Sequence, residues 1–403
     1  MGAAGPAARP SRRAFVLVID ACGVGALPDA AAYGDAGTNT LAHLAEQLGG
    51  IELPVLGSLG LGSIVPLRGV APSVDPAIHG RLRPLGPGKD SITGHWELMG
   101  VVAERALPTY PQGFPPQLIA RLEAACGHAL ICNRPDNGLV AIEQFGSEHL
   151  RSGALIIYTS QDSVLQLAAH VDRVPVQELY RACAAARALM SGADAVGRVI
   201  ARPFAGEPGA FVRTEGRRDF ALSPPARSYL QELEDSGVEV HAVGKIDDLF
   251  AGVGVSVAHE GATNARALDA AEELLAGLQG GFVLVNLIET DQLYGHRKDA
   301  AGFARALGEI DARVGRMLAG LREDDLLIVT ADHGVDLSHP GTDHTREYAP
   351  LLAVSGEMLA RRAAGGALGG ARHDGPLADV GATVLRWLTG GEGEGLPGRA
   401  FIS

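Results

Sequence analysis

The sequence predicts an α/β protein whose core is a mostly parallel sheet between two layers of helices. Short apolar runs of strand length alternate with amphipathic segments of helix length along most of the 403 residues. This alternation favours parallel strands, because a parallel connection needs a crossover as long as a helix, and the crossovers cover both faces of the sheet. Polar residues directly follow several of the apolar runs, as expected at the carboxyl edge of such a sheet.

Five short apolar runs are predicted to be strands. They are rich in valine, isoleucine, leucine and phenylalanine, which pack well on a buried pleated surface. Polar or turn-forming residues bound them on both sides. The runs cover residues 15–19, 155–158, 282–288, 326–330 and 351–354.

Longer amphipathic segments lie between these runs and are predicted to be helices. Their apolar residues recur at intervals of three and four, as on one face of a helix. They cover residues 40–48, 116–125, 176–191, 262–278 and 300–321. Residues 1–13 are small, polar and proline-containing, and are predicted to form a disordered tail.

The composition excludes several classes of protein. Hydrophobic residues make up 46% and charged residues 20% of the chain, as in a globular protein with a sizeable core. The net charge of −13 would repel the phosphates of a nucleic acid, so no nucleic-acid partner is expected. No apolar run approaches the ~20 residues that a membrane span needs, so no membrane partner is expected either. Nothing in the sequence indicates a protein partner.

The N-terminus and the cysteines both indicate a cytoplasmic protein. The apolar run at residues 15–19 ends at Asp20, which makes it too short for the core of a signal peptide. The four cysteines show no C-x-x-C spacing and are too few for a disulfide framework. We therefore expect reduced thiols at Cys22, Cys126, Cys132 and Cys183.

Acidic and histidine side chains follow three of the predicted strands. They are Asp20 after residues 15–19, Asp291 and His296 after residues 282–288, and Asp332, His333 and His344 after residues 326–330. Because open α/β sheets bind ligands at the carboxyl ends of their strands, we expect these side chains to lie at one edge. Three carboxylates and three imidazoles form a mixed oxygen and nitrogen set that suits two divalent cations.

A glycine-containing segment at residues 88–97 carries a candidate nucleophile, Ser91. Its sequence is Gly-Lys-Asp-Ser-Ile-Thr-Gly-His-Trp-Glu. Small neighbours expose the hydroxyl, and backbone N–H groups at the start of a helix favour an anionic phosphoryl group. A nearby metal would lower the pKa of the hydroxyl. For this segment taken alone, an N-cap serine in a glycine-rich turn is the commoner interpretation.

Nine segments resemble the phosphopentomutases, a family of the alkaline phosphatase superfamily, and they occur in the family's order. Two of them are especially specific: Thr-Ala-Asp-His-Gly at residues 330–334 and Gly-Thr-Asp-His-Thr-Arg-Glu at residues 341–347. The others cover residues 18–26, 34–41, 89–97, 158–164, 197–204, 243–246 and 294–297. The resemblance therefore extends over most of the chain.

The resemblance implies a particular domain organisation. Members of the family build an alkaline-phosphatase-like core from both ends of the chain and insert a smaller α/β cap domain between them. In this chain the core would comprise residues 14–102 and 221–403, and the cap residues 103–220.

The resemblance also implies roles for individual residues. One Mn²⁺ ion would be bound by Asp291, His296 and His344, and a second Mn²⁺ ion by Asp20, Asp332 and His333. Ser91 would carry the phosphate, where the family usually has threonine. Residues matching those that bind the sugar phosphate are Ser160, Asp162, Arg198, Arg213 and Lys245.

The implied reaction is that of a phosphopentomutase in nucleoside metabolism. Ribose or deoxyribose 1-phosphate and 5-phosphate would interconvert through a phosphoserine and a pentose bisphosphate, with a sugar bisphosphate as activator. Three departures from the family leave the metal ligands and the nucleophile in place, and two of them lie in or beside the cap, where the sugar would be recognised. The chain has Asn137-Gly138-Leu139 in place of Ser-Gly-Thr, Ile288-Glu289-Thr290-Asp291 in place of Val-Asp-Phe-Asp, and Arg218 in place of histidine.

Other activities are open at this point. They are a mutase for a different or modified pentose phosphate, a cofactor-independent phosphoglycerate mutase, a metal-dependent phosphatase of the same superfamily, and a non-catalytic sugar-phosphate-binding protein. A phosphoglycerate mutase usually carries Asn-Ser at the nucleophile, where this chain has Asp90-Ser91. Release of free phosphate would identify a phosphatase, and the absence of any phosphoenzyme would favour a binding protein.

Overall fold

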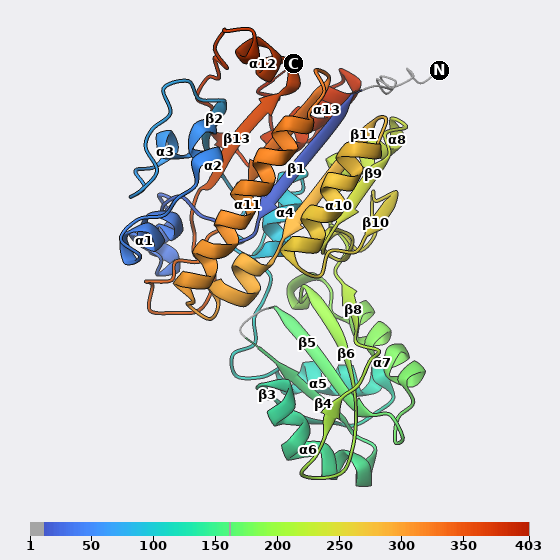
Figure 1. The fold of residues 1–403 in the computed structure, drawn as a ribbon. Coiled ribbons are helices and arrows are strands. Elements are labelled where there is room, and N and C mark those ends of the chain that lie inside the picture. The colour runs from blue at the N-terminus through green and yellow to red at the C-terminus, as the bar shows by residue number, and fades with distance from the viewer. Residues whose placement is uncertain (1–11, 161–162, 403) are drawn as a thin grey trace. The chain divides into compact units, whose positions relative to one another are not determined.

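The computed structural model describes residues 12–160 and 163–402, and its chain divides into two compact units (Figure 1). The larger unit comprises Met1–Ala106 and Pro224–Ser403, and the smaller one comprises Leu107–Ser223. The larger unit is therefore built from both ends of the chain. The boundaries expected from the sequence were residues 103 and 220, and the assignment of the smaller unit as a cap stays a prediction.

An eight-stranded sheet forms the centre of the larger unit. Its strand order is β10-β9-β11-β1-β12-β13-β2-β14. The strands are β10 (Val257–His259), β9 (Val240–Val243), β11 (Gly281–Leu287), β1 (Arg13–Ile19), β12 (Asp325–Thr330), β13 (Ala349–Ser355), β2 (Ile78–Arg83) and β14 (Gly375–Pro376). The first five are parallel to one another, whereas β13 is antiparallel to both β12 and β2. The mostly parallel sheet predicted from the sequence is confirmed, and β13, which contains residues 351–354, runs antiparallel to its neighbours.

Strand β1 lies between β11 and β12 and is fully buried, which explains its continuous apolar sequence. Its first residue, Arg13, was predicted to belong to the disordered tail. It is instead buried, and its Nε donates to Asp325 Oδ1 of β12 at 2.7 Å while Nη1 donates to Leu275 O at 2.6 Å. A buried arginine with these partners is part of the core, so the tail prediction was wrong at this residue. Residues 1–11 of the predicted tail lie outside the described residues.

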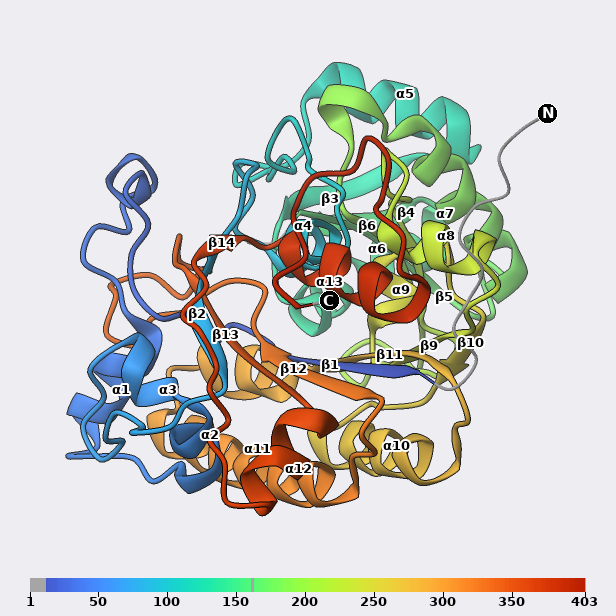
Figure 2. The same ribbon diagram turned by 90° about the horizontal axis from the view of Figure 1, so that it is seen from above.

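Helices cover both faces of this sheet (Figure 2). On one face lie α10 (Asn264–Gly277), α11 (Ala300–Gly320) and α2 (Pro54–Leu59), and on the other lie α4 (Ser91–Leu98), α9 (Ile246–Leu249) and α13 (Asp379–Thr389). The remaining helices of the unit are α1 (Thr40–Gln47), α3 (Leu61–Ile64), α8 (Tyr229–Asp235) and α12 (Gly356–Ala363). The layered α/β arrangement predicted from the sequence is confirmed.

The smaller unit has its own sheet and core. Its strands are β3 (Leu130–Pro135), β4 (Leu155–Thr159), β5 (Val164–His170), β6 (Arg198–Ala205), β7 (Val212–Arg213) and β8 (Arg218–Ala221). Side chains of α5 (Pro116–Cys126) and α7 (Val176–Leu189) pack on one face. Side chains of α6 (Gly138–Ser152) pack on the other, against Ile156, Ala168 and Phe204. Each face of the sheet thus has a separate apolar cluster.

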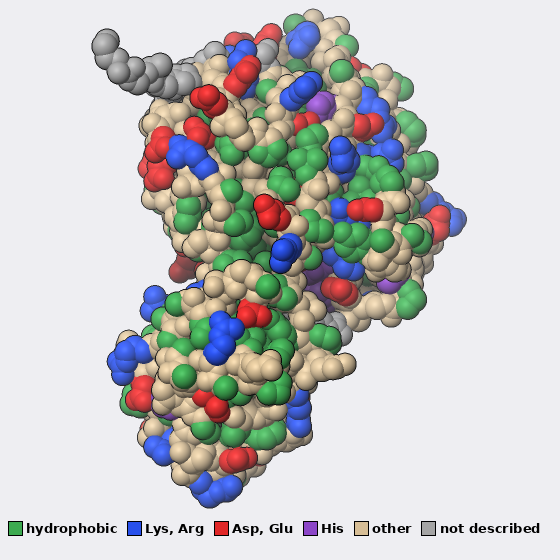
Figure 3. Space-filling view, turned by 180° about the vertical axis from the view of Figure 1, so that it is seen from behind, with side chains coloured by type: hydrophobic (Ala, Val, Ile, Leu, Met, Phe, Trp, Pro, Cys, Tyr) green, Lys and Arg blue, Asp and Glu red, His purple; other side chains and the backbone are tan. Residues whose placement is uncertain are grey.

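The surface and the helices agree with the composition. On the face shown in Figure 3, acidic and basic side chains are interspersed among apolar ones. Within residues 12–160 and 163–402, no helix combines the length and apolar character needed to cross a membrane.

Candidate metal centre

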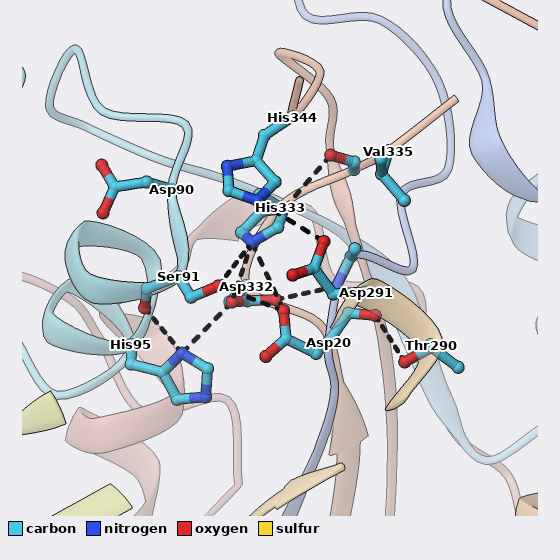
Figure 4. A network of polar contacts seen from close by, with 12 residues as sticks. Asp20, Asp90, Ser91, His95, Thr290, Asp291, Asp332, His333, Val335 and His344 are labelled. Carbon is cyan, nitrogen blue, oxygen red and sulfur yellow. Dashed lines mark hydrogen bonds and ion pairs between the residues drawn. The ribbon is translucent and has the colours of Figure 1, made fainter. Parts of the chain in front are cut away.

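Three neighbouring strands of the larger unit deliver the predicted metal-binding residues to one edge of its sheet (Figure 4). Asp20 directly follows β1, Asp332 and His333 follow β12, and Asp291 lies in a π-helical segment (η3, Thr290–Gly295) that follows β11. The three strands are parallel, so their carboxyl ends meet. The hydroxyl of Thr290 donates to Asp20 O at 2.7 Å and ties the ends of β11 and β1 together.

Asp291, His296 and His344 form one group of potential ligands. His296 Nε2 lies 3.4 Å from Asp291 Oδ2, and His344 Nε2 lies 3.4 Å from Asp291 Oδ1. His296 Nδ1 lies 2.6 Å from Thr342 O, a carbonyl that can only accept. The proton of His296 therefore belongs on Nδ1, and the Nε2 lone pair faces the carboxylate, as in histidines that bind metals.

Asp20, Asp332, His333 and Ser91 lie around a second point. His333 Nε2 is 3.4 Å from Asp20 Oδ1 and 3.2 Å from Asp332 Oδ2. Ser91 Oγ donates to Asp20 Oδ1 at 3.3 Å and lies 3.0 Å from His333 Nε2. Asp291 also reaches this point, because potential ligand atoms of Asp20, Asp291 and His333 all lie within 4.8 Å of one another. The sequence assigned Asp291 to the first group alone, whereas its carboxylate borders both.

The buried carboxylates of this site strongly influence one another. Burial and the neighbouring Asp332 raise the pKa of Asp20. Burial alone would also raise the pKa of Asp332, but the imidazoles of His333 and His95 hold it down at about 2. Burial opposes ionisation of Asp291 too, and His344 and His296 lower its pKa well below the usual range. Three carboxyl groups packed within a few ångströms of one another in a buried site call for compensating positive charge.

The donor atoms fit divalent cations. Asp291 Oδ1, Asp332 Oδ2 and His344 Nε2 are buried and make no hydrogen bond. Buried polar atoms without a hydrogen bond are uncommon in proteins, and a bound cation would satisfy these three lone-pair donors. Carboxylate and imidazole donors together suit Mn²⁺, Zn²⁺ or Co²⁺. The chain therefore has the residues to hold a divalent metal at this edge.

Ser91 is the first residue of α4, and its N-cap is Asp90. The Asp90 carboxylate accepts hydrogen bonds from the N–H groups of Ile92 and Thr93 at 3.0 and 3.1 Å. The sequence predicted that such N–H groups favour a phosphoryl group, but these two are already bonded to Asp90. The N-cap therefore fixes the start of the helix, and the attraction for an anionic phosphoryl group would have to come from cations bound by the residues beside Ser91.

The loop before Ser91 is held from two directions. The Glu97 carboxylate accepts from the N–H groups of Leu85 at 2.5 Å and Gly86 at 2.9 Å. Arg346 is buried, and its Nη1 donates to Gly88 O at 2.6 Å while its Nη2 pairs with Asp29 at 3.0 Å. These contacts fix the backbone that leads to Ser91, the candidate nucleophile. Arg346 lies two residues after His344, in one of the segments that carry the family resemblance, but the sequence indicated no role for it.

Two further buried residues at the site were not predicted from the sequence. His95 lies one turn after Ser91 on α4, and Asn286 lies within β11. Asn286 is a polar residue in a buried apolar strand, and this is the signal that could have identified it.

The residues expected to bind the sugar phosphate are distributed over both units. Ser160 follows β4, Arg198 begins β6 and Arg213 lies in β7, all in the smaller unit. Lys245 precedes α9 in the larger unit, and Asp162 lies outside the described residues. Arg198 and Arg213 therefore lie in the same compact unit, whereas the predicted metal-binding residues lie in the other unit.

Arginines concentrate on the sheet of the smaller unit. Arg198 Nη1 lies 3.6 Å from Asp219, an acid that also accepts from Arg217 at 2.8 Å. Burial and the positive charge of Arg217 lower the pKa of Arg202. Arg198 Nε is buried without a hydrogen bond. The partly buried arginines near Asp219 therefore carry positive charge that this single acid does not fully balance. Such an arrangement favours an anionic ligand.

Comparison with known proteins gives one consistent result. A family model described as the Metalloenzyme superfamily matches residues 12–389. A phosphopentomutase of Caldanaerobacter subterraneus subsp. tengcongensis is 47% identical over 348 residues, covering 86% of this chain and 88% of the relative. A phosphopentomutase of Desulfitobacterium hafniense is 43% identical over 395 residues, covering 97% and 99%. One of Anaeromyxobacter sp. is 46% identical over 380 residues, covering 94% and 96%.

The solved structures give a likeness of fold. A phosphoglycerate mutase from Leishmania mexicana covers 98% of both chains with a TM-score of 0.50 at 14% identity. This similarity reflects a shared architecture, whereas the curated relatives share almost half of the sequence.

Proposed function

We propose that a phosphorylated Ser91 carries the transferred phosphate in this chain, which belongs to the phosphopentomutase family and interconverts pentose 1-phosphates and 5-phosphates. The single observation that carries the proposal is the position of Ser91 Oγ, 3.3 Å from Asp20 Oδ1 and 3.0 Å from His333 Nε2. A hydroxyl placed beside metal-binding side chains is the arrangement that phosphoryl transfer through a serine requires.

Two divalent ions, proposed to be Mn²⁺, would be held by six residues. Asp291, His296 and His344 would hold one ion, and Asp20, Asp332 and His333 the other, with Asp291 lying beside both. The ions, when bound, would neutralise charge on the transferring phosphoryl group and lower the pKa of the serine hydroxyl. The buried, unbonded donor atoms of Asp291, Asp332 and His344 support this assignment.

The chain's own residues would position the reactants. In the first half-reaction, phosphorylated Ser91 would give its phosphoryl group to the free hydroxyl of the pentose phosphate, so the Oγ–P bond breaks as the new sugar O–P bond forms. In the second, Ser91 Oγ would attack the other phosphorus of the bisphosphate and release the isomeric monophosphate. A sugar bisphosphate would restore enzyme whose serine has lost its phosphate, and so act as the activator.

The smaller unit would bind the sugar phosphate. We assign this role to Ser160, Asp162, Arg198 and Arg213, together with Lys245 of the larger unit, and we assign residues 107–223 as the cap of the enzyme. The incompletely balanced arginines beside Asp219 support an anionic ligand there, because a guanidinium pairs strongly with phosphate. The cytoplasmic location expected from the thiols and the N-terminus fits the same activity.

The alternatives differ in how far the observations support them. The curated relatives are phosphopentomutases at 43–47% identity, whereas the likeness to a phosphoglycerate mutase is one of fold at 14% identity. A phosphatase would share the metal-binding residues and the nucleophile, so only products distinguish it from a mutase.

The proposal is tested with ribose, deoxyribose and arabinose 1-phosphates, in the presence of Mn²⁺ and a catalytic amount of sugar bisphosphate. We expect the corresponding 5-phosphate to form with little free phosphate, and the rate to rise with the bisphosphate. Steady release of phosphate, no isomer and no response to bisphosphate would replace the mutase by the phosphatase. The comparison of the three sugars identifies the preferred pentose.

A further inference from the structure

A buried amide and a buried imidazole connect the nucleophile to the carboxylates of the candidate metal centre. Asn286 is 1% exposed in β11, where its Cα partner on β1 is Val18, two residues before Asp20. His95 is fully buried on α4, four residues after Ser91. Neither is among the proposed metal ligands or substrate-binding residues. Polar groups buried this deeply are costly unless their hydrogen bonds are made, so their partners are informative.

The partners of Asn286 fix the orientation of its amide. Its Nδ2 lies 2.8 Å from Asp20 Oδ2 and 3.2 Å from His95 Nε2. An ionised carboxylate can only accept, so the amide nitrogen, rather than its oxygen, must face Asp20. The second hydrogen of Nδ2 then points to His95 Nε2, which must act as an acceptor.

The tautomer of His95 follows from this arrangement. If Nε2 accepts, the single proton of the neutral imidazole is on Nδ1. Nδ1 lies 2.8 Å from Ser91 O, to which it donates, and 3.2 Å from Asp332 Oδ2 (Figure 4). His95 thus contacts the Ser91 backbone and Asp332 through Nδ1. Its Nε2 accepts from the Asn286 amide, which also contacts Asp20.

The two carboxylate oxygens of Asp20 differ in their surroundings, and so do those of Asp332. Asp20 is held through Oδ2 by Asn286, and its Oδ1 faces Ser91 and His333. Asp332 is held through Oδ1 by the N–H of Ala21 at 3.1 Å, and its Oδ2 makes no hydrogen bond. In both residues one oxygen is anchored and the other is presented to the site. His95 lies against the presented oxygen of Asp332 without satisfying it.

We propose that His95 and Asn286 are positioning residues that hold Ser91 at a fixed position relative to Asp20 Oδ1 and Asp332 Oδ2. This proposal rests on the proposed function, because the position of Ser91 affects the reaction only if Ser91 carries the phosphate. His95 acts by donating from Nδ1 to the Ser91 carbonyl, and Asn286 acts by fixing the His95 tautomer and anchoring Asp20. Loss of either contact is expected to weaken metal binding and to slow phosphorylation of Ser91 more than it weakens substrate binding.

Two substitutions at residue 95 distinguish the roles of the two ring nitrogens of His95. The amide of His95→Asn places a donor close to the position of Nδ1, whereas the amide of His95→Gln reaches the position of Nε2 and leaves Ser91 O without its partner. We expect the Gln variant to lose about 10–100-fold in Mn²⁺ affinity or in kcat, the range seen when partners of metal ligands are removed, and the Asn variant to lose distinctly less. The KM should change less than kcat in both.

Asn286→Leu tests the other half of the proposal. Leucine has a similar size and no donor, so Asp20 loses its anchor while the strand keeps an apolar side chain. We expect a loss of Mn²⁺ affinity of about 10–100-fold. His241→Asn is the matched control, because His241 is a buried histidine of the same unit whose ring contacts His259 rather than the site.

Three readouts are needed: Mn²⁺ titration of the metal-free proteins, intact-mass measurement of phosphate on Ser91 after incubation with sugar bisphosphate, and kcat and KM for isomerisation. Melting temperatures of the metal-free variants identify any that fail to fold, and the remaining variants still decide the question. Equal behaviour of the Asn and Gln variants at residue 95, or unchanged Mn²⁺ affinity in Asn286→Leu, would overturn the proposal. Failure of the wild type to isomerise pentose phosphates would instead reject the proposed function, and the metal titrations would still assess positioning.

Discussion

The carbonyl oxygen of Asp332 lies 2.6 Å from the point that a Cβ on Gly94 would occupy. Helix α4 therefore packs directly on the backbone that follows β12, and only glycine allows this approach at its fourth residue. Since Ser91 begins the same helix, this contact sets how close the Ser91 hydroxyl comes to Asp332 and His333.

Gly94→Ala is expected to reduce activity sharply. The added methyl group must push α4 away from Asp332, and displacements of about 1 Å at reacting groups cost on the order of 100-fold in rate. Overpacking should also lower the free energy of unfolding by about 1–3 kcal/mol. Kinetics and urea unfolding measure both effects. Gly308→Ala is the control, because Gly308 lies in α11 with open space at its Cβ position, and it should keep full activity.

Ser91→Ala should keep the fold and lose turnover by about five or six orders of magnitude, the scale seen when a nucleophile is deleted. Intact-mass measurement after incubation with sugar bisphosphate should find no phosphate on this variant. Ser91→Thr keeps the hydroxyl and adds only a methyl group, so it should still be phosphorylated. A phosphorylated alanine variant at undiminished activity would show that the phosphate is carried elsewhere.

Metal analysis should find about two equivalents of Mn²⁺ per chain, as in two-metal phosphotransfer sites generally. Asp332→Ala should lose at least one equivalent, because it removes a buried carboxylate oxygen that makes no hydrogen bond. Asp311→Asn provides a control, since Asp311 accepts from the N–H groups of Val55 and Leu56 instead of contacting the site. An unchanged stoichiometry in Asp332→Ala would contradict the ligand assignment.

Arg213→Ala should convert part of the mutase activity into hydrolysis. Ser91 and the proposed metal ligands are untouched, but the bisphosphate loses a charge-assisted contact and is held less firmly, so water can attack one of its phosphoryl groups and release inorganic phosphate. The expected result is slower isomerisation with a larger fraction of turnovers ending as free phosphate. Arg121→Ala, which removes a surface arginine paired with Asp194, should leave this partition unchanged. Equal partition in both variants would remove Arg213 from the proposed substrate site.

The smaller unit should lose stability in mild acid through His149. His149 Nδ1 lies 2.6 Å from Ala154 O and its Nε2 accepts from the N–H of His170 at 2.8 Å, so both nitrogens are committed in the neutral form. Burial lowers the pKa of His149 in the folded protein. The unfolded chain, with a pKa of about 6.5, then takes up the proton first. The stabilisation is complete above that pH and is lost as the pH falls toward the lower folded pKa.

Urea unfolding between pH 8 and pH 5, with hydrogen exchange of amides 138–170, measures this loss. In His149→Gln the side-chain oxygen can accept from the same N–H without titrating, so the stability of that variant should depend less on pH. An identical pH dependence in both proteins would show that another group is responsible.

The sequence predicted the architecture well because its strongest signals reflect burial. The apolar runs that became β1, β11 and β12 are buried on both faces and have no alternative assignment. The antiparallel direction of β13 was not predicted, because a short apolar run has the same sequence pattern whether its neighbours are parallel or antiparallel. Arg13 was assigned to the tail because a charged residue that follows a small, polar, proline-containing sequence gives no indication of a buried partner 312 residues away.

The residues of the candidate site were likewise predicted only in part from the sequence. Asp20, Asp291 and Asp332 follow strands directly, so the rule that ligands bind at carboxyl ends brings them together from the sequence alone. The position of Asp291 beside both groups depends on the π-helical turn at Thr290–Gly295, which residue spacing does not predict. His95 and Asn286 act through hydrogen bonds between different elements, and no local pattern reveals such pairs.

The central strand of the larger unit also has a consequence for synthesis. β1 leaves the ribosome long before its partners β11 and β12, and Arg13 can pair with Asp325 only after 312 further residues have been added. At about 5–20 residues per second this interval lasts roughly 15–60 s. The contiguous residues 107–223 can fold in the meantime, while a wholly apolar strand stays without its sheet. Nascent chains stalled before residue 325 are therefore expected to contain a folded smaller unit and to require chaperones for β1.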